Sequence, residues 1–97
     1  MKILLDECLP IDFRHSLPGH EVHTADWVGF KSLKNGRLLQ EAETAGYEVL
    51  LTVDQGVPYQ QNLTQRKIAI LVIHSRTNQM EGLLSAIEGI LFALEKI

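Results

Sequence analysis

Carboxylate side chains that follow two aliphatic runs are the residues of this 97-residue chain best suited to chemistry. Asp6 and Glu7 directly follow the run at residues 2–5, and Asp54 directly follows the run at residues 47–53. Carboxylates held close together repel each other, so they share a proton or a cation. Mg²⁺ and Mn²⁺ prefer oxygen ligands, and a bound Mg²⁺ activates water and stabilises charge that grows on a phosphate. The pattern therefore predicts a metal-assisted site at Asp6 and Asp54, which Glu7 reaches only if the chain bends.

The elements that must position these acids alternate between strands and helices. Continuous aliphatic runs are typical of strands buried on both faces, whereas the polar second run predicts a strand near the sheet edge. Strands are expected at residues 2–5, 20–25, 47–53 and 68–73. Helices are expected at residues 9–17, 37–45 and 80–94, with a weak helical turn at 59–63 and a left-handed Gly46 after the second helix. This order predicts a single α/β domain over residues 1–97, a three-layer α/β/α sandwich with a mostly parallel four-stranded sheet.

The two aspartates converge if the first and third predicted strands are neighbours in this sheet. Open parallel sheets bind ligands beyond the carboxyl ends of their strands, near the point where the strand order reverses. Asp6 and Asp54 would then face one crevice. The alternative is that each aspartate only caps a helix or forms a turn after its strand.

Composition and charge exclude several classes of protein. The chain is 45% hydrophobic and 22% charged, which is ordinary for a soluble globular domain and excludes an intrinsically disordered one. No apolar run approaches the roughly 20 residues that span a bilayer, and Asp6 comes too early for a signal peptide. The net charge of −3 argues against a strongly basic protein that coats nucleic acid. Since the single cysteine excludes an internal disulfide and fits a reducing compartment, we expect a cytoplasmic protein with no membrane partner.

Aromatic and apolar residues elsewhere are open to more than one interpretation. Trp27 and Phe30 follow the second predicted strand and could stack on bases, although a small hydrophobic plug over the middle helix is favoured. No set of Cys and His residues completes a tetrahedral zinc site. The apolar stripe of the last predicted helix is compatible with burial inside the domain or with a homodimer.

Four short motifs, taken in order along nearly the whole chain, resemble a known family. They are Asp6-Glu7-Cys8-Leu9-Pro10 after the first strand, Gly19-His20-Glu21-Val22 in the second, Thr52-Val53-Asp54 at the end of the third, and the aliphatic run at residues 67–73. This ordered set resembles small PIN-like proteins, a family long described only as a domain of unknown function and related to VapC-type toxins.

This resemblance implies both an activity and a set of functional residues. It implies a PIN-like domain that cuts RNA with Mg²⁺ or Mn²⁺ as the toxin of a type II toxin–antitoxin pair, with a small antitoxin protein as partner. Asp6 and Asp54 would be the catalytic residues and metal ligands, and Glu7 a further metal ligand. The candidate substrate-binding residues are Asn35, Gln55 and Arg76.

Departures from the family pattern favour one alternative function. Cys8, Asn35 and Gly56 stand where relatives often carry Asn, Asp and a second acid. A reduced set of acids is expected of a catalytically degenerate PIN-like module that only binds a partner.

A receiver-like phosphoacceptor domain is the other alternative. Such domains place an acidic pair after the first strand, here Asp6 and Glu7, and the phosphorylated aspartate after the third, here Asp54. Ser75 would match the hydroxyl that follows the fourth strand. No fifth strand ending in lysine is predicted, which makes this alternative weaker.

Overall fold

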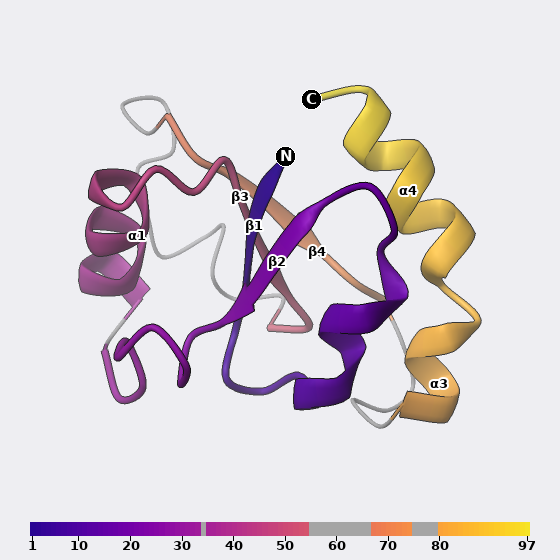
Figure 1. The fold of residues 1–97 in the computed structure, drawn as a ribbon, viewed down its shortest axis with the longest axis horizontal. Helices are drawn as coiled ribbons and strands as arrows, with labels where there is room; N and C mark the ends of the chain where they lie inside the picture. Colours follow the sequence, from indigo (N-terminus) through magenta and orange to yellow (C-terminus); the bar gives the residue numbers. More distant parts are fainter. Residues whose placement is uncertain (34, 55–66, 75–79) are drawn as a thin grey trace.

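The computed structural model describes residues 1–33, 35–54, 67–74 and 80–97, and these contain one sheet of four parallel strands (Figure 1). The strands are β1 (Lys2–Leu5), β2 (Glu21–Thr24), β3 (Val49–Thr52) and β4 (Ala69–Val72). Their order across the sheet is β2-β1-β3-β4, and each neighbouring pair is parallel. The α/β fold and the parallel sheet expected from the sequence are therefore confirmed.

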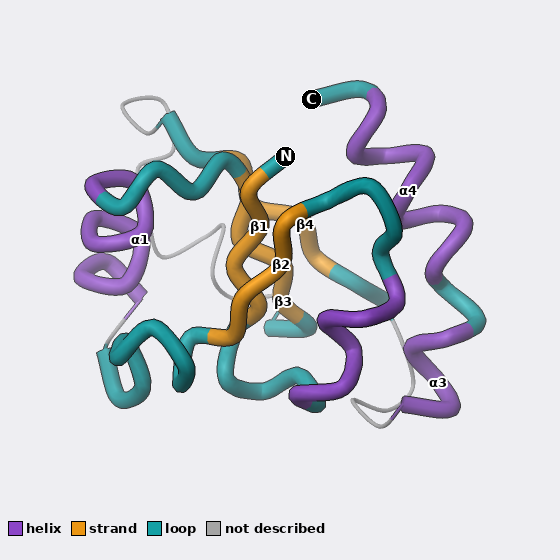
Figure 2. The backbone as a smooth tube through the Cα atoms, viewed as in Figure 1, coloured by secondary structure: helices purple, strands orange, loops and turns teal. Residues whose placement is uncertain are grey.

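Helical segments lie on opposite sides of this sheet (Figure 2). The 3-10 segment η1 (Ile11–Ser16), α3 (Met80–Leu84) and α4 (Ile87–Glu95) lie on one side, and α1 (Asn35–Thr44) lies on the other. The chain runs from β1 through η1 to β2, and then through α1 back past β1 to β3. Because these two connections run in opposite directions on opposite faces, both crossovers have the same hand.

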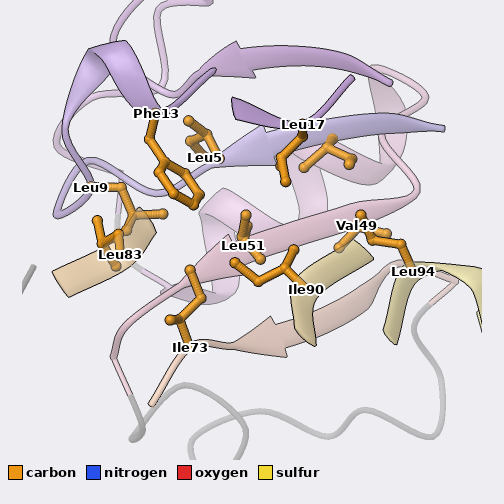
Figure 3. Close-up of a cluster of buried hydrophobic side chains, with 11 residues drawn as sticks. Leu5, Leu9, Phe13, Leu17, Val49, Leu51, Ile73, Leu83, Ile90 and Leu94 are labelled. Atoms are coloured by element: carbon orange, nitrogen blue, oxygen red, sulfur yellow. The ribbon is translucent and has the colours of Figure 1, made fainter. Parts of the chain in front are cut away.

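Alternate side chains of β1 belong to two separate hydrophobic clusters. Ile3 and Leu5 lie in a cluster with Phe13 of η1 and Leu83 of α3 (Figure 3). Leu4 lies in a second cluster, which includes the buried side chains of α1. The three apolar side chains of β1 are fully buried, and burial of each contributes roughly 1.5–3 kcal/mol. The sequence of β1 is therefore a continuous aliphatic run, because hydrophobic clusters cover both faces of the strand.

The two outer strands of the sheet differ in polarity, although both lie at an edge. β2 forms one edge, as its polar residues predict. β4 forms the other edge, where Ile70 packs on the α1 cluster and Leu71 packs on the opposite one. Cover on both faces of β4 is thus confirmed, but all four of its side chains stay half-buried because no strand lies beyond them among the described residues.

The helix expected at residues 80–94 is instead divided in two, so that prediction is wrong in its continuity. α3 ends at Leu84 and α4 begins at Ile87. The Ser85 hydroxyl donates to the carbonyl of Gly82 at 2.8 Å, and the Ala86 amide donates to Leu83 three residues earlier at 3.0 Å. These local bonds tighten the chain and compete with the regular helical pattern, a behaviour common for serine.

The helix expected at residues 9–17 is a 3-10 segment rather than an α-helix. η1 follows Pro10 and ends before Leu17, whose φ of −119° and ψ of 77° lie outside the helical region. Leu17 precedes Pro18, and the proline ring disfavours a helical conformation in the residue before it. Short pieces of this kind are typical of 3-10 structure.

Gly46 ends α1 with a φ of +88°, as its position in the sequence predicts. Glycine adopts this left-handed conformation without the cost that a Cβ imposes. No helix in the described part of the chain is long and apolar enough to cross a membrane.

Candidate functional site

The carboxyl ends of β1 and β3 lie side by side at the point where the strand order reverses. The chain leaves β1 toward β2 on one side, while β3 pairs with β1 on the other. The Asp6 amide donates to the carbonyl of Leu51 at 2.9 Å, which continues the β1–β3 ladder by one residue. Asp6 therefore lies at the switch point, the usual ligand-binding edge of an open parallel sheet.

The hydroxyl of Thr52 links the two predicted acidic positions. Thr52 is the last residue of β3 and is fully buried. Its Oγ1 donates to Oδ2 of Asp6 at 2.7 Å and accepts the backbone amide of Asp54 at 3.0 Å. The Asp6 carboxylate and the Asp54 backbone are thus hydrogen-bonded to the same oxygen atom.

Thr52 is a residue of the candidate site that the sequence patterns do not single out, since there it is only one letter of the Thr-x-Asp motif. A hydroxyl at the end of a buried aliphatic strand is the signal that could identify it, because buried polar groups are almost always hydrogen-bonded. Here the acceptor of the Thr52 proton is Asp6, the acid that follows the neighbouring strand.

Cys8 also contacts this hydroxyl. Its Sγ lies 3.6 Å from Oγ1 of Thr52. Since the Thr52 proton is directed to Asp6, the thiol is the donor in this contact. Cys8 is half-buried and belongs to the edge of the site as well as to the hydrophobic cluster beside it.

The Asp6 carboxylate is held in one orientation by two neutral donors. Oδ2 accepts from the Thr52 hydroxyl, and Oδ1 accepts from the Glu7 amide at 2.8 Å. Each carboxylate oxygen has two lone pairs, so both oxygens keep acceptor capacity for a cation. Asp6 is half-buried and Asp54 is exposed, so this edge is open to solvent.

Glu7 is directed to the loop that follows β2. Its Oε2 accepts from the amide of Ser32 at 3.3 Å, and Ser32 has a φ of 77°, unusual for a residue with a Cβ. Among the described residues, no three His, Cys, Asp or Glu side chains gather in a group that could hold a metal ion. At this edge the bonds through Thr52 fix the Asp6 carboxylate and the Asp54 backbone.

Several candidate residues fall outside the described residues. Gln55 and Arg76, expected to bind substrate, lie there, as do Gly56 and Ser75. Asn35 begins α1, but its side chain is also outside the description.

Trp27 and Phe30 are expected from the sequence to form one hydrophobic plug, and the structure separates them. Phe30 packs against the α1 cluster, as that prediction requires. Trp27 is 74% exposed, so the prediction is wrong for this residue. The aromatic ring instead lies over His23, with 4.8 Å between the ring centroids.

No protein-family model matches the chain, and no curated protein or solved structure is significantly similar to it. Its function therefore has to be inferred from the geometry at the sheet edge and from the order of its motifs.

Proposed function

We propose that this chain is a PIN-like endoribonuclease that depends on Mg²⁺ or Mn²⁺ and serves as the toxin of a type II toxin–antitoxin pair. The observation that carries this proposal is the Thr52 hydroxyl, which holds the Asp6 carboxylate and the Asp54 backbone together at the switch point. An edge of this kind is where open parallel sheets bind their ligands. Support for RNA as the substrate comes from the resemblance in motif order.

The chain's own residues would have two tasks in this reaction. Asp6 and Asp54 would ligate the ion through their carboxylate oxygens. Thr52 and the Glu7 amide would keep the Asp6 carboxylate in the orientation needed for that ligation. A divalent ion bound there would supply an activated water molecule and offset the charge on the scissile phosphate. Thr52 is a positioning residue in this scheme, since it acts through Asp6.

A protein partner is part of the same proposal. Leu84 and Phe92, on α3 and α4, are large apolar side chains left exposed beside the buried stripe of these helices. Exposed apolar surface of this kind supports contact with a small antitoxin or with a second copy of the chain. Co-expression with the product of the neighbouring reading frame, followed by size-exclusion chromatography, distinguishes a hetero-complex from a homodimer.

The direct test is RNA cleavage by the purified protein in Mn²⁺ or Mg²⁺, with and without a chelator. We expect cleavage that the chelator stops and that Asp6→Asn and Asp54→Asn each abolish. Glu88→Gln removes an exposed carboxylate in the first turn of α4 and is the matched control, which should cleave like the parent protein. Cleavage that continues unchanged in both aspartate variants would overturn the proposal.

A second candidate function is a binding module without catalysis. The direction of Glu7 toward Ser32 favours it, because the third acid is held in another contact. Such a module should gain no stability from divalent ions. A nuclease site should gain about 2.7 kcal/mol when the free ion is present at roughly 100 times its dissociation constant. Thermal unfolding with and without Mn²⁺, repeated for Asp6→Asn, separates the two functions.

A further inference from the structure

A pocket of about 390 Å³ lies against the edge strand β2. Its walls are η1, with Ile11 and Arg14, the strand itself, and the turn residues Asp26 and Trp27. This volume is within the range of pockets that bind small ligands. The Asp6 carboxylate is not among the lining residues, so this pocket is separate from the acidic site.

The indole of Trp27 offers a flat, accessible surface on this pocket. The ring is 74% exposed, and it leans on the imidazole of His23 with an interplanar angle of 34°. His23 is itself held by the Tyr47 hydroxyl, 2.8 Å from Nδ1. The Trp27 amide donates to Oγ1 of Thr24 at 3.1 Å, which fixes the start of the turn. The contact with His23 and the hydrogen bond to Thr24 therefore position the indole in the absence of a ligand.

Arg14 provides a cation on the opposite wall. One of its nitrogens donates to the carbonyl of Ile11 at 3.1 Å, and a guanidinium has five N–H donors, so others remain for an anion. Asp26 adds one carboxylate to the lining. The charges of Arg14 and Asp26 offset each other, so a bare anion gains little here. A ligand that combines a flat ring with a single phosphate gains both stacking and a charge-assisted hydrogen bond.

The outer backbone of β2 adds hydrogen-bonding groups to the pocket. The amides of Glu21 and Ala25 donate to β1, to the carbonyls of Met1 and Leu5 at 2.9 Å each. Backbone groups alternate in direction along a strand, so those of Val22 point away from β1, on the side of the pocket. An N–H and a C=O on one residue are a pair that the edge of a nucleobase can use.

We propose that this pocket binds one nucleotide of single-stranded RNA, with the base stacked on Trp27 and a phosphate on Arg14. The inference deepens the proposed ribonuclease function and rests on it for the identity of the polymer. The Ala25 amide bonds to Leu5, so Trp27 and Asp6 follow adjacent strands at the same end of the sheet. A nucleotide in the pocket would thus be a near neighbour of the phosphate at the acidic site.

Trp27 is the only tryptophan of the chain, so its fluorescence reports this pocket alone. We expect adenosine, guanosine, cytidine or uridine monophosphate to quench it saturably in the presence of a chelator. Inorganic phosphate and ribose 5-phosphate, which have no flat ring, should leave it unchanged. Arg14→Gln should weaken nucleotide binding about tenfold or more, whereas Arg37→Gln, a change on the exposed face of α1, should not.

Binding of a dye-labelled single-stranded RNA, followed by anisotropy without metal, tests the stacking surface itself. Trp27→Ala should weaken this binding about tenfold or more, and Trp27→Phe should restore part of it. Trp27 is exposed, so neither change should unfold the protein, which circular dichroism verifies.

The outcomes separate this inference from the nuclease proposal. Cleavage with the same KM in Trp27→Ala and Arg14→Gln overturns the pocket and leaves the nuclease. Metal-free nucleotide binding by a protein that never cleaves RNA supports the pocket and overturns the nuclease. Equal quenching by phosphate and by nucleotides, or a dimer that Trp27→Ala converts to a monomer, shows that the pocket serves another purpose and overturns the inference.

Discussion

At the amino ends of the strands, the Lys2 cation lies against the end of a helix and an aromatic ring, whereas at the carboxyl ends the Asp6 carboxylate accepts hydrogen bonds from a hydroxyl and an amide, with no cation beside it among the described residues. The Lys2 ammonium donates to the carbonyl of Ala45 after α1 at 2.7 Å and lies 4.6 Å from the centre of the Tyr47 ring. A cation at the C-terminal end of a helix and over an aromatic ring is stabilising on both counts. Asp6, by contrast, accepts from a hydroxyl and an amide.

This difference fits the proposed division of the sheet, in which the amino end contributes to stability and the carboxyl end carries the proposed site. A carboxylate without a cationic partner can bind a cation from solution. Groups arranged in this way for binding often lower the stability of the folded protein. We therefore expect changes at the amino end to leave cleavage unaltered. Changes at the carboxyl end should lower cleavage far more than stability, except at Thr52, where both should fall.

Asp6→Asn gives the largest effect and tests the functional end directly. We expect cleavage to fall about 100-fold or more, because a proposed metal ligand is lost. The free energy of unfolding should change by only about 0.5 kcal/mol, since no ion pair is broken. RNA cleavage and urea unfolding measure the two quantities.

Glu48→Gln is the matched change at the amino end, where the Glu48 carboxylate accepts from the Lys2 amide. It should leave cleavage unchanged and lower the free energy of unfolding by a few tenths of a kcal/mol, roughly the worth of an exposed hydrogen bond. Equal losses of activity in Glu48→Gln and Asp6→Asn would break the comparison between the two ends.

Thr52→Val keeps the shape of a buried side chain and removes its hydroxyl. The free energy of unfolding should fall by about 1–3 kcal/mol, because the amide of Asp54 and the Asp6 oxygen both lose a partner. Thr52→Ser retains the hydroxyl and should keep most of the metal response. Urea unfolding and Mn²⁺-induced stabilisation measure this pair, and a Thr52→Val protein with full metal response would refute the positioning role.

Gly46→Ala tests the turn that brings Tyr47 back to the amino end. With φ at +88°, alanine is strained there, so the free energy of unfolding should fall by about 1 kcal/mol. Gly89 lies inside α4, where a Cβ would meet nothing within 4 Å, and Gly89→Ala should raise stability by about 0.5–1 kcal/mol. Thermal unfolding of both variants checks that the two changes in stability have opposite signs. A loss of stability in both would mean that steric crowding by the added Cβ, rather than the backbone angle φ, determines the effect.

The smallest effect is a pH dependence at the amino end. Burial, and secondly the nearby charge of Glu21, raise the pKa of Tyr47 above its ordinary value. The unfolded chain therefore ionises this tyrosine first, at about pH 10, and stability is complete below that pH and falls as the pH rises through the folded-state pKa. The free energy of unfolding in urea, measured across this range, should decline less in Tyr47→Phe. The same decline in both proteins would assign it to other groups.

Much of the fold is predictable from local pattern. The runs at β1 and β3 are aliphatic without alternation because both faces of the sheet are covered. The polar residues of β2 place it at an edge, and Gly46 marks the end of α1. The division between α3 and α4 could not be predicted from the apolar stripe, because it depends on the hydrogen bond from the Ser85 hydroxyl to the carbonyl of Gly82.

The sequence by itself determined that Asp6 and Asp54 each follow a buried strand, since this depends only on the order of residues along the chain. Only the tertiary structure decided that β1 and β3 are neighbours and that Thr52 lies between the two acids. It also directed Glu7 to Ser32 and left Trp27 exposed over His23. Contacts of this kind join segments far apart in the chain, and periodicity within one segment carries no information about which other segment lies beside it.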